Sequence, residues 1–323
     1  MNCKKLLALT LSVMLLLSFA ACGAPAEKTA VKICGIKGPT GIGLANMWAA
    51  DDAGTAKNDY TFSLVSVPAD AGNKVVTGEA DIAAVPTNLA SALYNKTNGA
   101  VQMLAVNTLG VLHILENSDT VQTFADLKGK TIYSTGAGAN PEYILRHLLT
   151  KNGINPDTDV TLKFVAENDE LATLMVTGEA KIALVPEPVV TTVLTKNAAV
   201  RKALDVTAEW KKLGEGELMM GCVIVKKSFA EANPKAVKNF LKDYEASINS
   251  VNEDIDGTAA LCEKYEIIPK AAVAKKAIPG CNITFVDGKD MKNQIAGYFN
   301  VLNTAKPAAI GGKLPADDFY YGA

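Results

Sequence analysis

The sequence VTGEADIAAVP, residues 76–86, returns one hundred positions later as VTGEAKIALVP, residues 176–186, with only two positions changed. A helix-like segment precedes each copy, Gly78 or Gly178 stands where that helix would end, and a short apolar strand then runs to a proline. Two unrelated helix–strand turns would not share so many identities. The repeat therefore indicates that the chain contains two related α/β units.

A second matching segment lies upstream of each copy. A predicted strand leads into a Gly-rich turn at residues 38–43 in the first unit and at residues 136–138 in the second, and each turn opens a helix. We expect Asn140 to be the N-cap of the second helix. The distance to the proline that ends the repeat is 46 residues from Thr40 and from Asn140. Two units with the same internal spacing predict two α/β lobes.

Four strand ends are candidates for a ligand site. In an open parallel α/β sheet, ligands bind outside the carboxyl ends of the strands, where glycines and helix N-termini offer main-chain N–H groups. Two lobes that face one another would bring two such ends each to a single cleft. The residues predicted to line this cleft are Lys37, Gly38, Pro39, Thr40, Gly41, Pro86, Thr87, Asn88, Gly136, Ala137, Gly138, Asn140 and Glu187.

Some of these residues also have a simple structural explanation. Thr40 and Asn140 could cap helices and hold their loops rigid without touching a ligand. Asn88 and Glu187 follow the two prolines without an evident capping role, which makes ligand contact the favoured interpretation for both. Trp48 stands at helical spacing from the preceding apolar positions and is expected to pack in the core.

The N-terminus predicts export. Residues 1–21 combine Lys4 and Lys5 with an apolar run and a small-residue exit, the pattern of a secretory signal that is too short to be a stable transmembrane helix. Small residues that end at Cys22 and are followed by glycine resemble the lipobox of bacterial lipoproteins, which implies a lipid on Cys22. Residues 22–30 then form a tether. We therefore expect a protein held on the outer face of the cell membrane by lipid, without spanning it.

Composition argues against several classes of partner. The net charge is −2 at pH 7 and no basic block is present, so nucleic acid is not an expected partner. Cys34 and Cys222 lie in apolar, strand-like runs and are expected in the core. Cys262 and Cys281 could form a disulfide in an exported protein, and their spacing does not decide whether they do.

The sequence gives little support to catalysis. The two histidines, His113 and His147, are flanked by apolar residues and belong to no metal-binding pair or nucleophile motif. The Gly-rich turns are not a P-loop, because no Gly-Lys-Ser/Thr follows them, and Pro141 removes a helix-opening N–H that a dinucleotide fingerprint needs. We therefore predict no cofactor, no metal and no enzymatic activity.

Two extended apolar runs divide the chain. The run from Val101 and the run at residues 217–229 are interpreted as crossings between the lobes. Lobe one is expected at residues 31–116 and 219–323, and lobe two at residues 117–218. The predicted fold class is therefore α/β, with helices expected near the C-terminus in PKAVKNFLKDYEASINSV, GTAALCEKYEI and DMKNQIAGYFNVLN.

The order of these segments resembles a known family. The strand–Gly-turn–helix openings, the repeated GEADIAAVP and GEAKIALVP, the NPEYILRHLL helix and the terminal IGGKLPADDFYY resemble extracytoplasmic solute-binding proteins of ABC importers. The nitrate, sulfonate and taurine type is the most similar group, and proteins that bind the thiamine pyrimidine precursor are related to it. The resemblance covers essentially the whole exported chain and rests on order and spacing.

The resemblance implies a fold and a function. The fold would be that of type II periplasmic-binding proteins, with two doubly wound α/β lobes joined by two crossing segments. A monomer of this kind closes on a small polar solute, here an aminosulfonate, another small organic anion or an aminopyrimidine, and delivers it to an ABC permease in the membrane. The alternative is an enzyme on the same fold, related to thiamine pyrimidine synthesis, but the Cys-rich iron site of that chemistry is not visible in the sequence.

Overall fold

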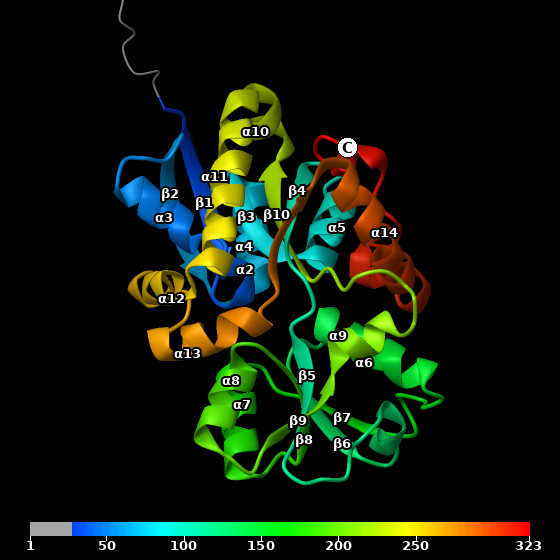
Figure 1. The fold of residues 1–323 in the computed structure, drawn as a ribbon. Helices are drawn as coiled ribbons and strands as arrows, with labels where there is room; N and C mark the ends of the chain where they lie inside the picture. The colour runs from blue at the N-terminus through cyan, green and yellow to red at the C-terminus, as the bar shows by residue number, and fades with distance from the viewer. Residues whose placement is uncertain (1–27) are drawn as a thin grey trace, which may run out of the picture.

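The computed structural model describes residues 28–323, and they form two lobes, each built on its own β-sheet (Figure 1). The predicted signal peptide, Cys22 and most of the predicted tether lie outside the described residues. Among residues 28–323, no helix combines the length and the apolar character that crossing a bilayer requires.

Lobe one is built on a six-stranded sheet with the order β11-β4-β10-β3-β1-β2. Its strands are β1 (Ala30–Ile36), β2 (Asp59–Val65), β3 (Ile82–Pro86), β4 (Val101–Thr108), β10 (Gly221–Lys226) and β11 (Ile283–Asp287). Its helices are α2 (Pro39–Ile42), α3 (Ala45–Asp52), α4 (Pro68–Thr77), α5 (Thr87–Lys96), α10 (Lys227–Ala232), α11 (Pro234–Glu253), α12 (Ile255–Lys264), α13 (Ala271–Ala277) and α14 (Gly288–Ala305). Short 3-10 turns are η2 (Ile278–Gly280), η3 (Pro307–Ile310) and η4 (Asp317–Phe319).

Lobe two is built on a five-stranded sheet with the order β7-β6-β8-β5-β9. Its strands are β5 (Leu112–Glu116), β6 (Thr131–Ser134), β7 (Thr161–Phe164), β8 (Ile182–Pro186) and β9 (Arg201–Asp205). Its helices are η1 (Phe124–Leu127), α6 (Asn140–Lys151), α7 (Asn168–Thr177), α8 (Val189–Lys196) and α9 (Val206–Lys211).

The repeated sequence folds the same way in both lobes. Helices α4 and α7 end at Gly78 and Gly178, whose φ angles of 83° and 78° lie in the left-handed region that glycine adopts at low cost. In each lobe the chain then enters a strand, β3 or β8, with four consecutive buried residues. The predicted helix–Gly–strand units are therefore confirmed.

One boundary of the predicted division is wrong. Strand β5, which was expected in lobe one, pairs antiparallel with β8 and β9 in the sheet of lobe two. The first crossing is therefore residues 109–111, directly after β4, and lobe two starts at residue 112. Asn107, Thr108 and Gly110 interrupt the apolar run at this point, but so short a break does not by itself indicate that the chain changes sheet.

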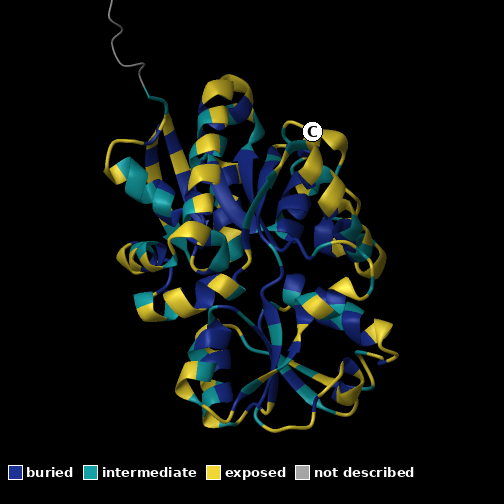
Figure 2. Cartoon of the chain, viewed as in Figure 1, coloured by how far each residue is buried: buried dark blue, intermediate teal, exposed yellow. Residues whose placement is uncertain are grey.

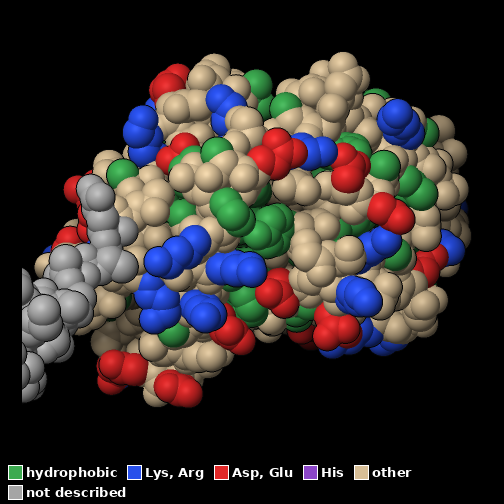
Figure 3. All heavy atoms as spheres, turned by 90° about the horizontal axis from the view of Figure 1, so that it is seen from above, with side chains coloured by type: hydrophobic (Ala, Val, Ile, Leu, Met, Phe, Trp, Pro, Cys, Tyr) green, Lys and Arg blue, Asp and Glu red, His purple; other side chains and the backbone are tan. Residues whose placement is uncertain are grey.

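The inner strands of both sheets and the inner faces of the helices are buried, while the edge strands β2, β7 and β9 and the outer faces of the helices are partly exposed (Figure 2). One apolar cluster continues from lobe one, where it includes Met103 and Tyr298, into lobe two, where it includes Tyr143 and Leu148. Trp48 packs inside lobe one as predicted, because its ring stacks between Phe62 and Tyr265 at centroid distances of 4.7 and 4.4 Å. Figure 3 shows Lys and Arg side chains interspersed with Asp and Glu on one face of the molecule.

The described cysteines are buried and unpaired. Cys34 and Cys222 lie in strands of lobe one, as expected. Cys262 and Cys281 have free thiols in a separate apolar cluster of lobe one, which also contains Phe240 and Tyr244. Burial raises the pKa of Cys262 to about 12, so its thiol stays protonated at neutral pH.

Candidate functional site

Three of the four predicted loops meet where the second crossing enters β10. The main-chain N–H of Thr87 and the side-chain amide of Asn140 both donate to the carbonyl oxygen of Met220, each at 3.1 Å. Thr40 lies beside the next residue, because a Cβ added to Gly221 would be 2.6 Å from Cγ2 of Thr40. Loops that follow β1 and β3 in lobe one and β6 in lobe two therefore converge on one short segment.

Two polar residues that the sequence reasoning missed support this segment. Asn107 and Thr108 end β4 and are each 1% exposed. The amide of Asn107 donates to the carbonyl of Thr40 at 3.3 Å and to the Tyr244 hydroxyl at 2.9 Å, and the Thr108 hydroxyl donates to Asn107 at 2.9 Å. The available signal was a polar pair that closes a long apolar strand.

Asn140 was expected to be the N-cap of α6, and this prediction is wrong. The N-cap is Ala139, in extended backbone, and Asn140 is the first helical residue, with its side chain turned to the crossing. Asn140 is 2% exposed, and its Oδ1 has no hydrogen-bond partner among residues 28–323. A buried carbonyl oxygen without a partner carries a desolvation penalty of about 1–3 kcal/mol, which a ligand donor would relieve.

Only part of the Gly-rich turn before α6 lies near the second crossing. Gly136 and Gly138 have φ angles of 76° and 72°, so the turn depends on glycine. The N–H of Gly138 donates to the Glu142 carboxylate at 2.7 Å. Ala137 and Gly138 are exposed at the tip of the turn, away from Asn140. The turn positions α6, and Glu142 already occupies one of its N–H groups.

The fourth loop places Glu187 between the lobes. Its carboxylate accepts the N–H of Thr191 at 3.1 Å and lies 3.4 Å from Nζ of Lys202, so it caps the first turn of α8. The expectation that Glu187 has no capping role is therefore wrong. Its main-chain N–H donates to Val111 in the first crossing at 3.0 Å, and a Cβ added to Gly280 of lobe one would lie 3.2 Å from its Oε1. Glu187, which is 2% exposed, therefore contacts both the first crossing and lobe one.

A histidine that the sequence reasoning set aside lies near this carboxylate. His113, on β5, has a buried Nδ1 without a hydrogen-bond partner in the described part of the chain. Burial lowers the pKa of His113, and the positive charge of Lys202 lowers it further, although Glu187 and Asp205 oppose this effect. The imidazole is therefore held in its neutral form.

The remaining predicted residues lie at the edge of the site or outside it. Asn88 is 6% exposed, its amide donates at 3.5 Å to Ala309 near the C-terminus, and its buried Oδ1 has no hydrogen-bond partner among residues 28–323. Lys37 is exposed and lies 3.8 Å from the Glu266 carboxylate. Gly38 has a φ of 105° and donates to Ile267 at 3.1 Å.

Three further predicted residues shape the loops. A Cβ on Gly41 would lie 2.3 Å from the carbonyl oxygen of Ile36, which explains the glycine there. Pro39 is the first residue of α2, a helix of four residues that lies within the segment expected to be a Gly-rich turn, and the expected helix follows as α3. Pro86 ends β3 and precedes α5.

Two cavities lie next to the crossings, and their linings contain none of the predicted cleft residues. The smaller, about 230 Å³, borders the first crossing and is lined by Leu109, Asn252, Ile278, Pro279, Asn282, Ile283 and Thr284. The larger, about 1020 Å³, is a groove lined by α6, the loop at residues 214–217 and α14.

Comparison with known proteins agrees with this architecture. A family model described as the periplasmic substrate-binding protein of phosphonate ABC transporters matches residues 57–267. No curated protein matches the chain in sequence.

Several solved structures share the fold. An ABC transporter protein from Parabacteroides distasonis is similar with a TM-score of 0.76 and 21% identity, over 91% of this chain and 99% of that one. The periplasmic aliphatic sulphonate binding protein SsuA from Escherichia coli gives a TM-score of 0.73 and 15% identity, over 91% and 92% of the two chains. The nitrate-binding protein NrtA from Synechocystis PCC 6803 gives 0.58 and 15%, over 83% and 76%.

These similarities confirm the predicted two-lobed α/β fold, and the family model confirms the resemblance to solute-binding proteins of ABC importers. The family model covers the end of lobe one's first segment, all of lobe two and the return into lobe one, which is the region that contains both crossings. The chain therefore belongs to the family of periplasmic substrate-binding proteins of phosphonate ABC transporters.

Proposed function

We propose that this substrate-binding component of an ABC importer closes its two lobes on a small polar solute and delivers it to a membrane permease. Residues 30–108 and 221–323 would act as one rigid lobe and residues 112–211 as the other, with the two crossings, residues 109–111 and 212–220, as the hinge. The extracytoplasmic location follows from the family. We further propose that lipid on Cys22 holds the chain at the outer face of the membrane.

The observation that carries this proposal is the shared carbonyl of Met220. Thr87 comes from lobe one and Asn140 from lobe two, and both donate to this one oxygen in the segment between the lobes. A solute bound beside this point would touch both lobes, so it would favour the closed arrangement by its higher affinity for that state.

The polar groups at this point suggest the chemistry of the solute. Helices α5 and α6 begin at Thr87 and Asn140, and helix N-termini favour an anionic or strongly accepting group. The unpartnered Oδ1 of Asn140 supplies an acceptor for an N–H of the solute. The four loops contain no arginine, so a solute with both a nitrogen donor and an accepting end fits better than a simple dianion.

We therefore propose an aminosulfonate, a related small organic anion or an aminopyrimidine as the solute. Sulfonate binding by SsuA, whose fold this chain shares, supports the first of these. The phosphonate named in the family model makes aminophosphonates a further class to screen. The proposed contacts are Thr40, Thr87, Asn107 and Asn140, whereas Glu187 would hold α8 and the contact with lobe one.

A thermal-shift screen tests the proposal. The purified chain is screened against sulfonates, phosphonates, nitrate, carboxylates, amino acids and aminopyrimidines. A solute that binds only the folded state stabilises it by about 2.7 kcal/mol at a hundredfold excess over Kd. Calorimetry on Asn140→Ala should then show weaker binding, whereas Ala137→Ser at the exposed tip of the same turn should bind normally. A screen without any stabilising solute would contradict the proposed binding function.

The same samples address the enzyme alternative. Mass spectrometry after prolonged incubation should recover each binding solute unchanged. Conversion of a bound solute into a product would instead favour an enzyme on this fold.

A further inference from the structure

The second crossing runs between one helix of each lobe. After α9 the chain passes α14 of lobe one and α6 of lobe two before it enters β10 (Figure 1). Residues 214–217 of this segment line the groove of about 1020 Å³ together with α6 and α14. Any rotation of one lobe against the other must therefore move this segment relative to at least one of the two helices.

The side chain of Glu215 fastens the crossing to lobe two. Its Oε2 lies 2.5 Å from Nε2 of His147, and its Oε1 lies 2.7 Å from Nζ of Lys151. The two partners stand one helical turn apart on α6. The side chains of Glu215 and His147 are 21% and 12% exposed, so solvent screens this contact less than an ordinary surface ion pair.

The main chain of the same residue lies against lobe one. A Cβ added to Gly297, in the middle of α14, would be 2.5 Å from the carbonyl oxygen of Glu215. The neighbouring Gly216 accepts a hydrogen bond from Nε1 of Trp210 at 3.1 Å. The Trp210 ring packs against the rings of His147 in α6 and Tyr298 in α14, with distances between ring centroids of 5.2 and 5.7 Å. At Glu215, the crossing therefore contacts α6 of lobe two through its side chain and α14 of lobe one through its main chain.

We propose that Glu215 is a latch that stabilises the lobe arrangement described here and so sets the balance between the open and closed forms. This inference rests on the proposed lobe closure. The two arrangements of such a protein differ by a few kcal/mol, so contacts made in only one of them shift the populations measurably. Glu215 acts as a positioning residue because its contacts are with α6 and α14 and not with the proposed solute site.

The chain offers a matched control two residues further on. Glu217 lies in the same segment and pairs with Lys211 of α9 at 3.4 Å, and both side chains are well exposed, at 40% and 57%. Lys211 belongs to lobe two alone and lies outside α6 and α14. Removing the Glu217 carboxylate therefore changes the charge of the crossing without touching the proposed latch.

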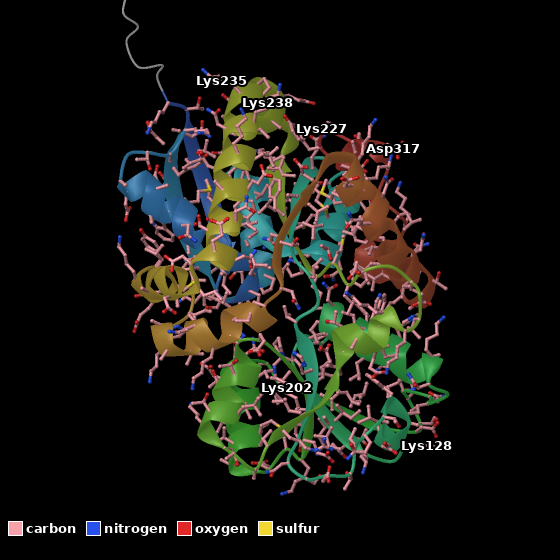
Figure 4. The ribbon with its side chains drawn as sticks, in the orientation of Figure 1. Lys128, Lys202, Lys227, Lys235, Lys238 and Asp317 are labelled. Carbon is pink, nitrogen blue, oxygen red and sulfur yellow. The ribbon has the colours of Figure 1, made fainter. Side chains whose placement is uncertain are left out.

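The test measures the distance between the lobes without any solute. Labels are placed at Lys128→Cys in lobe two and Lys238→Cys in lobe one, two exposed positions at opposite ends of the molecule (Figure 4). Cys3 and Cys22 are replaced by serine in every variant, and the four described native thiols are buried. Pulsed electron paramagnetic resonance then gives the distribution of lobe distances for each variant.

We expect Glu215→Ala to lower the ratio of the native arrangement to the other arrangement about three- to tenfold, because two charge-assisted bonds are lost. Lys151→Ala, which removes one of them at the surface, should have a smaller effect in the same direction. The charge swap Glu215→Lys with Lys151→Glu should restore most of the native distribution, which a purely structural loss would not allow. Glu217→Ala should resemble the native chain.

Native distance distributions in both Glu215→Ala and Lys151→Ala would overturn the latch. So would a swap that fails to restore the distribution when the single changes have shifted it. If Glu215→Ala does not fold, Lys151→Ala and the swap give the answer alone. Because the distance measurement uses no solute, a result that overturns the latch does not affect the proposed binding function. Likewise, if the thermal-shift screen finds no solute, the distance measurement can still detect the latch.

Discussion

Replacing Glu187 with glutamine separates two roles for this residue. The carboxylate is 2% exposed, caps α8 through Thr191 and lies 3.4 Å from Lys202. Glutamine keeps the shape and one acceptor oxygen but removes the charge. If the residue mainly holds α8 and the lobe contact at Gly280, the change should affect stability more than solute binding.

The structure sets the size of the expected effect. Loss of a negative charge at a helix N-terminus costs about 0.3–1 kcal/mol. Loss of the pair with Lys202, whose side chain is 42% exposed, costs about 0.2–1 kcal/mol. We therefore expect the free energy of unfolding to fall by about 0.5–2 kcal/mol, which lowers Tm by about 2–4 °C per kcal/mol.

The assay is a thermal melt followed by calorimetry with the first solute that the screen identifies. Affinity should change by less than about 1 kcal/mol, because both carboxylate oxygens already have partners within the chain. Glu179→Gln, an exposed carboxylate in the repeated segment of the same lobe, is the control and should change stability by less than about 0.5 kcal/mol. An unchanged Tm with an affinity loss of about 1.5–3 kcal/mol would refute this reasoning and make Glu187 a direct solute contact.

Three further outcomes are expected. Cys22→Ala should move the protein from the membrane fraction into the soluble extracytoplasmic fraction, and retention at the membrane would contradict the lipid anchor. Saturation with a confirmed solute should reduce the radius of gyration in small-angle scattering, and Asn140→Ala should need more solute to reach the same decrease; an unchanged radius at saturation argues against closure. Burial opposes ionisation of Glu116, but hydrogen bonds from Thr120 and Ser118 hold the pKa of Glu116 at about 2. A depressed carboxyl pKa stabilises the fold above the unfolded value and loses this effect as pH falls through the folded value, so Glu116→Gln should cost about 2 kcal/mol at pH 7 and little near pH 2 in denaturation experiments.

The repeated units could be predicted because their signals are local. A glycine in the left-handed region ends α4 and α7, and a run of apolar residues follows, so a few neighbouring residues determine each unit. Strand β5 was assigned to the wrong lobe for the opposite reason. Its sheet is decided by pairing with β8 and β9, which lie far along the chain, and the polar pair Asn107–Thr108 that precedes it does not indicate which sheet it joins.

The candidate site could be predicted only in outline. The sequence placed the four loops, but the direction of each side chain depends on distant partners. Asn88 turns to Ala309, which is 221 positions away, and Asn140 turns to Met220, which is 80 positions away. Asn107 was missed because its importance comes from contacts with Thr40 and Tyr244 in other parts of the chain.

The apolar cluster that continues from one lobe into the other has a consequence for how the chain can be divided. Tyr143 and Leu148 of α6 share it with Tyr298 of α14, and Trp210 packs against Tyr298 as well. A fragment of residues 112–216 would lack Tyr298 and would expose Tyr143, Leu148 and Trp210 more to water, each at a cost of up to about 1.5–3 kcal/mol. Among residues 28–323, the two sheets therefore share no hydrogen bonds, but the two lobes share part of one apolar core. We expect lobe two to be less stable when it is separated from lobe one.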